Sequence, residues 1–230
     1  MHVQSTARKN VGARDEAVVL TWQRKVQVYK RDDAAELHPG EAAPDKVECA
    51  LVLPPYDRAR DYKALAHLSS PQSYFEDFEL QTRIEHSRGR TMTSEHIALT
   101  AMLDNTSQVH CNQYMIDQNP ERFVGGQLII FGGIPFQLCL GLSCPDVADN
   151  SMGDIVYKTG RHSAPLFAGD TVFAATEIAG TRDLPGRPDL GALDTILRGH
   201  KFVRRDGASE KVEIFYLERT IAVKRRSHYG

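Results

Sequence analysis

Residues 132–142 read Gly-Gly-Ile-Pro-Phe-Gln-Leu-Cys-Leu-Gly-Leu, and most positions from Ile134 to Leu142 are apolar. A short apolar run that follows two glycines predicts a buried helix that begins near Gly133. Four segments rich in β-branched or alternating residues follow it: 154–159, 171–178, 195–203 and 211–224. One apolar helix followed by four strands predicts an α+β fold in which an antiparallel sheet wraps around a central helix.

The segments before this helix predict a strand, a second helix and a turn. A strand is expected near residues 82–90, and Thr93-Ser94-Glu95 is typical of the start of a helix that runs to Met102. Thr93 or Ser94 is expected to cap this helix, because both side chains accept hydrogen bonds from free backbone N–H groups. The turn that follows contains the candidate catalytic residues.

This turn, residues 103–110, reads Leu-Asp-Asn-Thr-Ser-Gln-Val-His and combines a carboxylate, an amide and an imidazole. General acid–base catalysis needs titratable groups within hydrogen-bond reach of one substrate atom. We therefore predict His110 as the acid–base residue, oriented by either Asp104 or Asn105. The glycine-rich segment 125–133 follows, and the N–H groups of Gly132 and Gly133 are predicted to bind an oxyanion, although close packing of helix and sheet also requires glycine.

Composition limits the classes of protein to consider. The chain has 230 residues, 41% of them hydrophobic, and a formal net charge of −2. This is enough apolar material for a core, and it gives no positive field that would favour nucleic acid. No segment approaches the roughly 18 apolar residues of a membrane span, and residues 1–14 lack the apolar region of a secretory signal. We expect a cytoplasmic protein.

Metal and disulfide sites are not predicted. The chain has no CxxC pair among its cysteines, which are Cys49, Cys111, Cys139 and Cys144. Cys111 follows His110 directly, but a buried or incidental thiol is the preferred interpretation. The spacing of His86, His96 and His110 fits no compact metal motif. No metal and no cofactor are therefore expected.

The N-terminal part differs in character from the rest. Residues 17–29 alternate as in a strand, and residues 21–31 match residues 216–226 in character at nearly every position. The match is either chance likeness of two basic amphipathic strands or a remnant of a duplicated domain. Prolines interrupt residues 32–71, which favours a linker. We expect an N-terminal strand and arm over residues 1–70 and one domain over residues 71–230.

Several motifs resemble those of the MaoC-like dehydratases, a hot-dog-fold family of enoyl-CoA hydratases, over roughly residues 74–226. They are residues 74–79, 88–93 and, most specific of all, 160–171, Gly-Arg-His-Ser-Ala-Pro-Leu-Phe-Ala-Gly-Asp-Thr. A closer likeness is to the C-terminal half of the two-hot-dog β-methylmalyl-CoA dehydratases, or mesaconyl-CoA hydratases, through residues 105–112, 132–133, 160–162, 185–187 and 190–193. Residues 22–31 then resemble the last strand of a preceding hot-dog repeat.

The resemblance implies a function and site residues. It implies reversible addition of water to a short branched or dicarboxylic enoyl-CoA, as in mesaconyl-CoA, with an acyl-CoA substrate and a homodimer as the minimum assembly. The family usually has Asp five residues before the histidine, where this chain has Asn105, with Asp104 one residue earlier. Arg161 and His162 are expected to meet CoA phosphates or a substrate carboxylate, or else to form a surface or dimer pair.

Two other functions fit the same resemblance. A hot-dog fold can direct activated water at the thioester carbonyl, which would make the protein a thioesterase. The unusual turn and the short N-terminal remnant also suit a non-catalytic acyl-CoA-binding subunit whose missing repeat comes from another chain. The basic cluster Lys224-Arg225-Arg226 attracts CoA phosphates in one interpretation and is a solvated strand end in the other.

Overall fold

The computed structural model describes residues 2–25 and 53–230. The contacts divide the chain into two units, residues 1–51 and residues 52–230. Each unit is described by itself below. The expected strand residues 26–29, the linker residues 32–52 and Cys49 lie outside the described residues.

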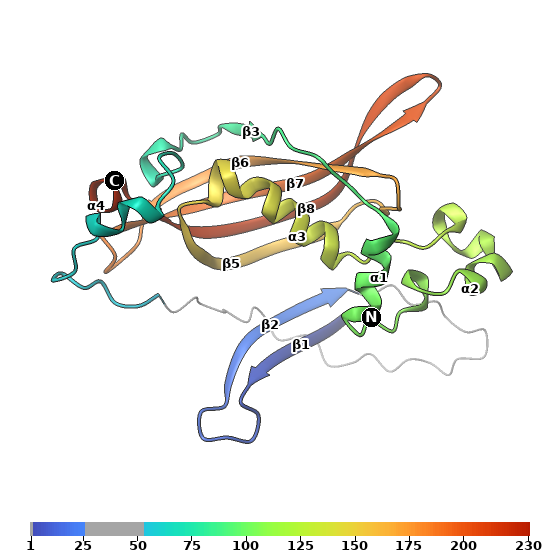
Figure 1. The fold of residues 1–230 in the computed structure, drawn as a ribbon, viewed down its shortest axis with the longest axis horizontal. Coiled ribbons are helices and arrows are strands. Elements are labelled where there is room, and N and C mark those ends of the chain that lie inside the picture. Colours follow the sequence, from blue (N-terminus) through green and yellow to red (C-terminus); the bar gives the residue numbers. More distant parts are fainter. Residues whose placement is uncertain (1, 26–52) are drawn as a thin grey trace. The chain divides into compact units, whose positions relative to one another are not determined.

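The first unit contains an antiparallel hairpin of β1, His2–Lys9, and β2, Ala17–Lys25 (Figure 1). β2 confirms the first nine positions of the expected N-terminal strand. β1 was not expected, because its residues are polar and show no apolar alternation. At the turn, Glu16 accepts hydrogen bonds from the Arg8 side chain and the Gly12 N–H at 2.6 and 3.0 Å. These contacts close the hairpin loop.

The second unit is built on a six-stranded antiparallel sheet with the strand order β3-β6-β7-β8-β5, in which β4 also pairs with β6. Its strands are β3 Arg83–Glu85, β4 Arg90–Thr91, β5 Ser151–His162, β6 Thr171–Asp183, β7 Leu190–Arg205 and β8 Ala208–Lys224. The four strands expected after the apolar helix are confirmed, and each is longer than its pattern indicated. The long strand expected near residues 82–90 is instead two short strands, β3 and β4, at the margin of the sheet.

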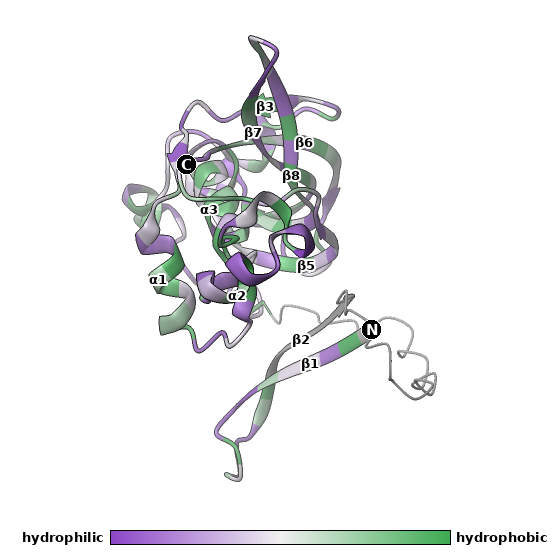
Figure 2. Cartoon of the chain, turned by 90° about the vertical axis from the view of Figure 1, so that its right-hand side faces the viewer, coloured by the Kyte–Doolittle hydropathy of each residue, from purple (hydrophilic) through white to green (hydrophobic). Residues whose placement is uncertain are grey.

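The apolar helix α3, Gly133–Ser143, lies against one face of this sheet (Figure 1). Figure 2 shows the helix coloured as hydrophobic, with strands beside it. Cys139 is fully buried, and Gly199 of β7 lets the helix approach closely, because a Cβ there would lie 2.5 Å from the Cys139 Sγ. Each fully buried Leu or Ile in this core stabilises the fold by about 1.5–3 kcal/mol. The expected α+β arrangement of sheet and central helix is confirmed.

Short helices connect the remaining parts. The other α-helices are α1 Ser94–Met102, α2 Gln113–Gln118 and α4 Arg226–Tyr229. The 3₁₀-helices are η1 Lys63–Leu68, η2 Phe75–Asp77, η3 Gln108–His110, η4 Pro120–Arg122 and η5 Val124–Gly126, and η6 Cys144–Ala148 is a π-helical turn. Thr93 is the N-cap residue of α1, as expected, and its own N–H donates to His96 Nδ1 at 3.0 Å. The α1 to α2 segment carries the candidate histidine.

Residues 53–70, which we expected in the N-terminal arm, contribute to the second unit. Tyr62 is buried in a cluster with Leu190 and Tyr229, and its ring lies edge-on to Tyr229 with centroids 5.2 Å apart. The carbonyl of Pro54 accepts a hydrogen bond from Arg187 at 2.7 Å. The backbone N–H of Ser70 donates to the side chain of the fully buried Asn150 at 2.9 Å.

A buried ion pair holds this end of the sheet together. Arg187 Nε and Nη2 donate to the two carboxylate oxygens of Asp189 at 2.8 and 2.7 Å, and the Tyr229 hydroxyl donates to the same carboxylate at 2.9 Å. Burial raises the pKa of Asp189, but the hydrogen bonds from Arg187 and Tyr229 outweigh it and lower the pKa below its usual range. The carboxylate therefore stays charged in the fold.

The substitution Asp189→Ala is expected to lower the free energy of unfolding by about 3–5 kcal/mol, because it leaves the Arg187 charge buried without its partner. Chemical denaturation followed by circular dichroism measures this change. Asp183→Ala is the matched control, since Asp183 pairs with Arg225 but its side chain is 92% exposed. It should cost less than about 1 kcal/mol. Equal losses in the two variants would contradict a structural role for the buried pair.

Candidate active site

A cavity of about 380 Å³ lies where the start of α3 meets the end of β5. It is lined by His110, Ile129, Ile130, Gly132, Pro135, His162, Ser163, Ala164, Pro165, Leu166 and Ile214. Most of these side chains are apolar. Among the described residues that line it, the two histidines are the titratable groups, so proton transfer inside this cavity depends on them.

His110 is held by the backbone of a distant segment. It ends the short turn η3, and its Nδ1 lies 2.8 Å from the carbonyl oxygen of Ile129. A carbonyl oxygen only accepts hydrogen bonds, so Nδ1 carries the hydrogen and Nε2 is the nitrogen left to react. The Phe131 ring lies edge-on to the imidazole, with centroids 5.6 Å apart. The histidine is half-buried and oriented.

The structure shows no hydrogen bond from Asp104 or Asn105 to His110, so their predicted orienting role stays a prediction. Asp104 lies two residues beyond the end of α1, has a positive φ of 52° and donates its N–H to the Ala101 carbonyl. The Asn105 side chain accepts the Ser107 N–H at 3.0 Å and shapes the turn. Neither residue lines the cavity. The carbonyl of Ile129 takes the orienting role, and no residue type in the sequence signals a backbone contact of this kind.

Gly132 and His162 meet at the edge of the cavity. A Cβ on Gly132 would lie 2.7 Å from His162 Nε2, so the glycine leaves the room that the imidazole occupies. The φ of Gly132 is −58°, which any residue adopts, so close approach alone requires glycine here. Gly133 is the first residue of α3, and a Cβ on it would lie 2.5 Å from the Phe131 ring. Both expected roles of these glycines, oxyanion binding and close packing, are compatible with this placement.

Backbone N–H groups are available at the start of α3. Within the described chain the N–H of Ile134 donates to the Phe131 carbonyl, whereas those of Gly132 and Gly133 donate to no backbone carbonyl. The first N–H groups of a helix have no partner within the helix and carry its partial positive charge. They can bind an oxygen that gains negative charge.

His162 and Arg161 point to opposite faces of the sheet. His162 pairs across the ladder with Phe215, whose ring is 5.4 Å from the imidazole, and Phe215 belongs to the core. Desolvation by the neighbouring groups lowers the pKa of the His162 imidazole, which favours its neutral form, although the residue as a whole is exposed. Arg161 lies over the Tyr216 ring at 3.8 Å and donates to Glu213 at 3.0 Å. Arg161 is therefore a partner of other side chains on the sheet and does not line the cavity; the period of two along a strand separates such neighbours.

The two other histidines considered for a metal lie apart from the cavity. His86 is buried, with Nδ1 2.7 Å from Asp146 and Nε2 2.8 Å from Thr176, so it ties η6 to the sheet. His96 belongs to the first turn of α1. Within residues 2–25 and 53–230 no group of three His, Cys, Asp or Glu side chains is placed to hold a metal ion. Among those same residues, no helix is long and apolar enough to cross a membrane.

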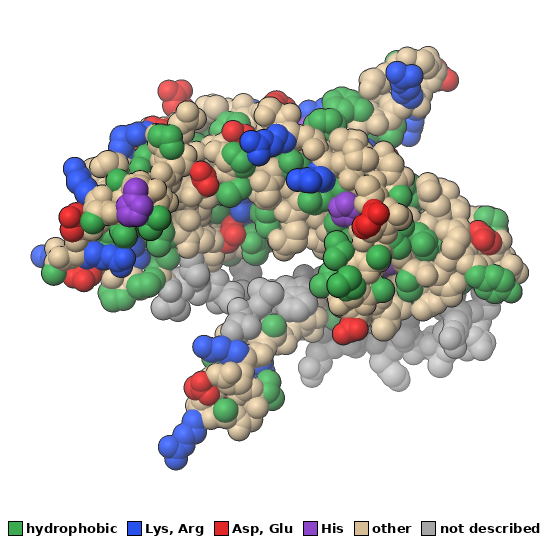
Figure 3. Space-filling view, viewed as in Figure 1, with side chains coloured by type: hydrophobic (Ala, Val, Ile, Leu, Met, Phe, Trp, Pro, Cys, Tyr) green, Lys and Arg blue, Asp and Glu red, His purple; other side chains and the backbone are tan. Residues whose placement is uncertain are grey.

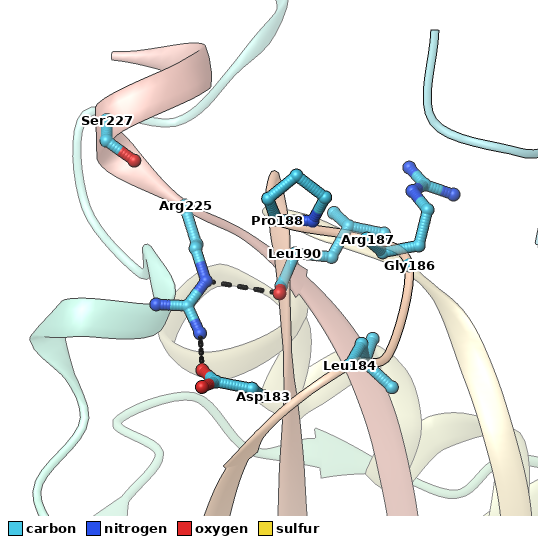
Figure 4. A pocket seen from close by; sticks show the side chains of 8 residues that line it. All are labelled: Asp183, Leu184, Gly186, Arg187, Pro188, Leu190, Arg225 and Ser227. Carbon is cyan, nitrogen blue, oxygen red and sulfur yellow. Dashed lines mark hydrogen bonds and ion pairs between the residues drawn. The ribbon is translucent and has the colours of Figure 1, made fainter. Parts of the chain in front are cut away.

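A second cavity, of about 420 Å³, lies at the other end of the sheet (Figure 4). Arg225 donates to the Leu190 carbonyl at 3.1 Å and to the carboxylate of Asp183, and Figure 4 shows both contacts. Arg226 donates to Asp77, and Lys224 donates to Ser69. The basic cluster at residues 224–226 is thus engaged within the protein. Each of the three side chains has a partner within the protein, and that of Arg226 is also 47% exposed.

Charged side chains are scattered over the surface seen in Figure 3, and no single-sign field covers that face. The apolar cavity lined by two imidazoles is the candidate active site. A sheet that wraps around a central helix, with a site at the start of that helix, defines the class of hot-dog proteins.

Comparison with known proteins narrows this class. No family model matches the chain. It is 35% identical over 179 residues to the β-methylmalyl-CoA dehydratase of Chloroflexus aurantiacus, and 32% identical over 184 residues to the mesaconyl-CoA hydratase of Cereibacter sphaeroides. Each match covers 76% of this chain and 49% of the relative. The chain thus spans about half the length of the curated relatives it matches.

Solved structures agree with these relatives. A MaoC domain dehydratase from Chloroflexus aurantiacus superposes with a TM-score of 0.73 at 30% identity, covering 92% of this chain and 62% of that one. A Mycobacterium tuberculosis protein described as a double hot-dog fold has a TM-score of 0.53 at 19% identity, covering 68% and 46%, and shows the shared fold. The chain belongs to the MaoC-like family of hot-dog dehydratases.

Replacing Gly132 by Ala is expected to displace the His162 ring, because the new methyl group would overlap it. The fold should lose less than about 1.5 kcal/mol, since the end of one side chain can move away. Long-range NMR spectra of the imidazole nitrogens report the displacement. Gly141→Ala on the same helix is the control: nothing lies within 4 Å of its added Cβ, and it should stabilise by about 0.5–1 kcal/mol. Unchanged His162 signals in Gly132→Ala would refute the contact.

Proposed function

We propose that this chain catalyses the reversible addition of water to the double bond of a short branched or dicarboxylic enoyl-CoA. The observation that supports this most is that one apolar cavity is lined both by His110, whose Nδ1 is held by the Ile129 carbonyl, and by Gly132 at the start of α3, whose N–H donates to no backbone carbonyl among the described residues. Membership of the MaoC-like family and two relatives named for a dehydratase and a hydratase support the same reaction.

The proposed mechanism uses one base and one oxyanion site. His110 Nε2 takes a proton from water while the water oxygen forms a bond to the β-carbon. The electron pair of the double bond moves toward the thioester oxygen, where the N–H groups of Gly132 and Gly133 stabilise it. The protonated His110 then gives its proton to the α-carbon. One water is added and the histidine returns to its first state.

Each part of the site has a physical reason in this scheme. The Ile129 carbonyl keeps the hydrogen on Nδ1 and so leaves a lone pair on Nε2. Removal of one donor from an oxyanion site typically costs about 3 kcal/mol of transition-state stabilisation. Apolar side chains such as Ile130 and Ile214 suit a short acyl chain and strengthen these contacts by excluding water. The scheme needs no metal and no redox cofactor, because the CoA thioester supplies the activated carbonyl group.

The names of the two relatives make mesaconyl-CoA the first substrate to test. We propose a homodimer as the minimum assembly, because most soluble oligomers are symmetric homo-oligomers and two-fold dimers are the commonest of them. The absorbance of the enoyl-thioester is expected to decay when the protein is mixed with mesaconyl-CoA, itaconyl-CoA or crotonyl-CoA, and His110→Ala should lower kcat/KM by at least about 10²-fold. His67→Ala, which removes an exposed imidazole from η1, is the control.

The outcomes separate the competing functions. Decay of the enoyl absorbance without release of free thiol, lost in His110→Ala and kept in His67→Ala, supports hydration. Release of free thiol would make the protein a thioesterase. Binding of acyl-CoA with neither reaction would make it a subunit that needs a partner, and either result would refute the proposal.

The two turn residues provide a second test. Asn105→Ala removes the acceptor of the Ser107 N–H and should lower kcat/KM about tenfold by loosening the turn that carries His110. Asp104→Asn keeps the size of the side chain and removes the charge, and its effect should be smaller than that of His110→Ala. Steady-state kinetics with the preferred enoyl-CoA measures both. A loss in Asp104→Asn equal to that in His110→Ala would restore the carboxylate to the mechanism.

A further inference from the structure

His162 is the second imidazole of the cavity, and the mechanism above leaves it without a role. Within the described chain neither of its ring nitrogens has a hydrogen-bond partner, in contrast to His86, whose nitrogens are both engaged. The ring lies between Phe215 and the backbone of Gly132, with its Nε2 edge toward the glycine. His162 is an exposed residue at the edge of the apolar cavity, and its imidazole, positioned by Phe215 and Gly132, is accessible to a ligand.

We propose that His162 donates a hydrogen bond from its imidazole to the thioester oxygen of the bound acyl-CoA, which makes it a catalytic residue of the same site. This inference rests on the proposed function. It gives His162 one partner, the thioester oxygen, where the sequence left several partners open. The donor adds to those of Gly132 and Gly133, and its contribution grows as negative charge develops on the oxygen. No proton has to leave His162 for this role.

The neutral form of the ring suits this task. Desolvation by the neighbouring groups favours the uncharged imidazole, and a neutral imidazole carries one N–H that can point to an acceptor. Since a lowered pKa keeps the ring neutral at and above its usual pKa, protonation affects it only at lower pH. Among the described residues that line the cavity, His110 is the other titratable group, and Arg161 faces the opposite side of the sheet. His162 is thus a hydrogen-bond donor and not a permanent cation.

The geometry also separates His162 from His110. His110 is oriented by the Ile129 carbonyl, which keeps the hydrogen on Nδ1 and leaves Nε2 as the acceptor nitrogen of a ring that lines the cavity. No comparable acceptor fixes the tautomer of His162 within the described residues, so either nitrogen can carry its hydrogen. The two rings therefore have different roles: His110 accepts the proton of water, and His162 polarises the thioester.

The test measures the polarisation of a bound thioester without any reaction. Saturated [1-¹³C]butyryl-CoA binds but cannot be hydrated, and its carbonyl stretch moves to lower frequency when hydrogen bonds polarise it. We expect such a shift with the unsubstituted protein and a smaller one with His162→Phe. His162→Gln retains a donor near the Nε2 position and should restore part of the shift. His67→Ala is the control on an exposed histidine.

Kinetics provides the second readout. His162→Phe should lower kcat/KM for hydration by about 10²–10³-fold, mostly in kcat, while His162→Gln loses less. Circular dichroism verifies that both variants fold, and the polar Gln variant tests the role if Phe disturbs the fold.

The outcomes distinguish this inference from the hydratase function. An unchanged carbonyl shift and rate in His162→Phe, with hydration still lost in His110→Ala, would overturn the role of His162 alone. Absence of any shift in the unsubstituted protein with bound butyryl-CoA would overturn it as well. A shift that disappears in His162→Phe, in a protein that hydrates no enoyl-CoA, would support His162 as a thioester-binding residue and refute the hydratase.

Discussion

The close packing of α3 against the sheet is the constraint on which the rest of the second unit depends. The helix can approach because Gly199 offers no side chain where Cys139 lies. The apolar contacts around it bury the helix on the inner face of the strands, with Leu197 and Leu217 in the same cluster. Because protein interiors are densely packed, this contact also fixes where the first turn of the helix lies. The cavity follows from that position.

The position of the helix start sets the chemistry of the site. Gly132 and Gly133 present backbone N–H groups there, and a side chain on either would meet a neighbouring ring. The same glycine that exposes the backbone makes room for His162. The segment after α1 carries His110, and the Ile129 carbonyl holds its imidazole at the same cavity as Gly132. Stability and chemistry therefore depend on the same close contacts.

The opposite face of the sheet has a different physical character. Asp194 accepts from Lys158, Arg182 and Thr220, and Glu213 accepts from Arg161 and Arg198. These pairs are partly exposed, so each contributes little to stability. These contacts pair the named charged side chains of that face with one another. Arg161 in particular is committed to Glu213 and Tyr216 and is not available to a ligand in the cavity.

The amino-acid sequence by itself determined the central helix, the helix before it and the four long strands that follow. The apolar run of residues 134–142 and the alternation of the later strands are local patterns, and local patterns report which face of an element is buried. The sequence also indicated His110 and the glycines before α3 as candidates, because their types and spacing suit acid–base and oxyanion chemistry, and the structure places His110 and Gly132 at one cavity. Thr93 was identified as a cap for the same kind of reason.

Only the tertiary structure decided which of these residues meet. The partner of His110 is a backbone carbonyl nineteen residues away, and every residue has such a carbonyl, so no pattern marks it. Asp104 and Asn105 are near His110 in the chain, but the end of α1 directs them into turn contacts. Arg161 and His162 are neighbours in β5, so their side chains lie on opposite faces of the sheet. Contacts between distant segments depend on how the helix and sheet pack, and that packing is a property of the whole fold.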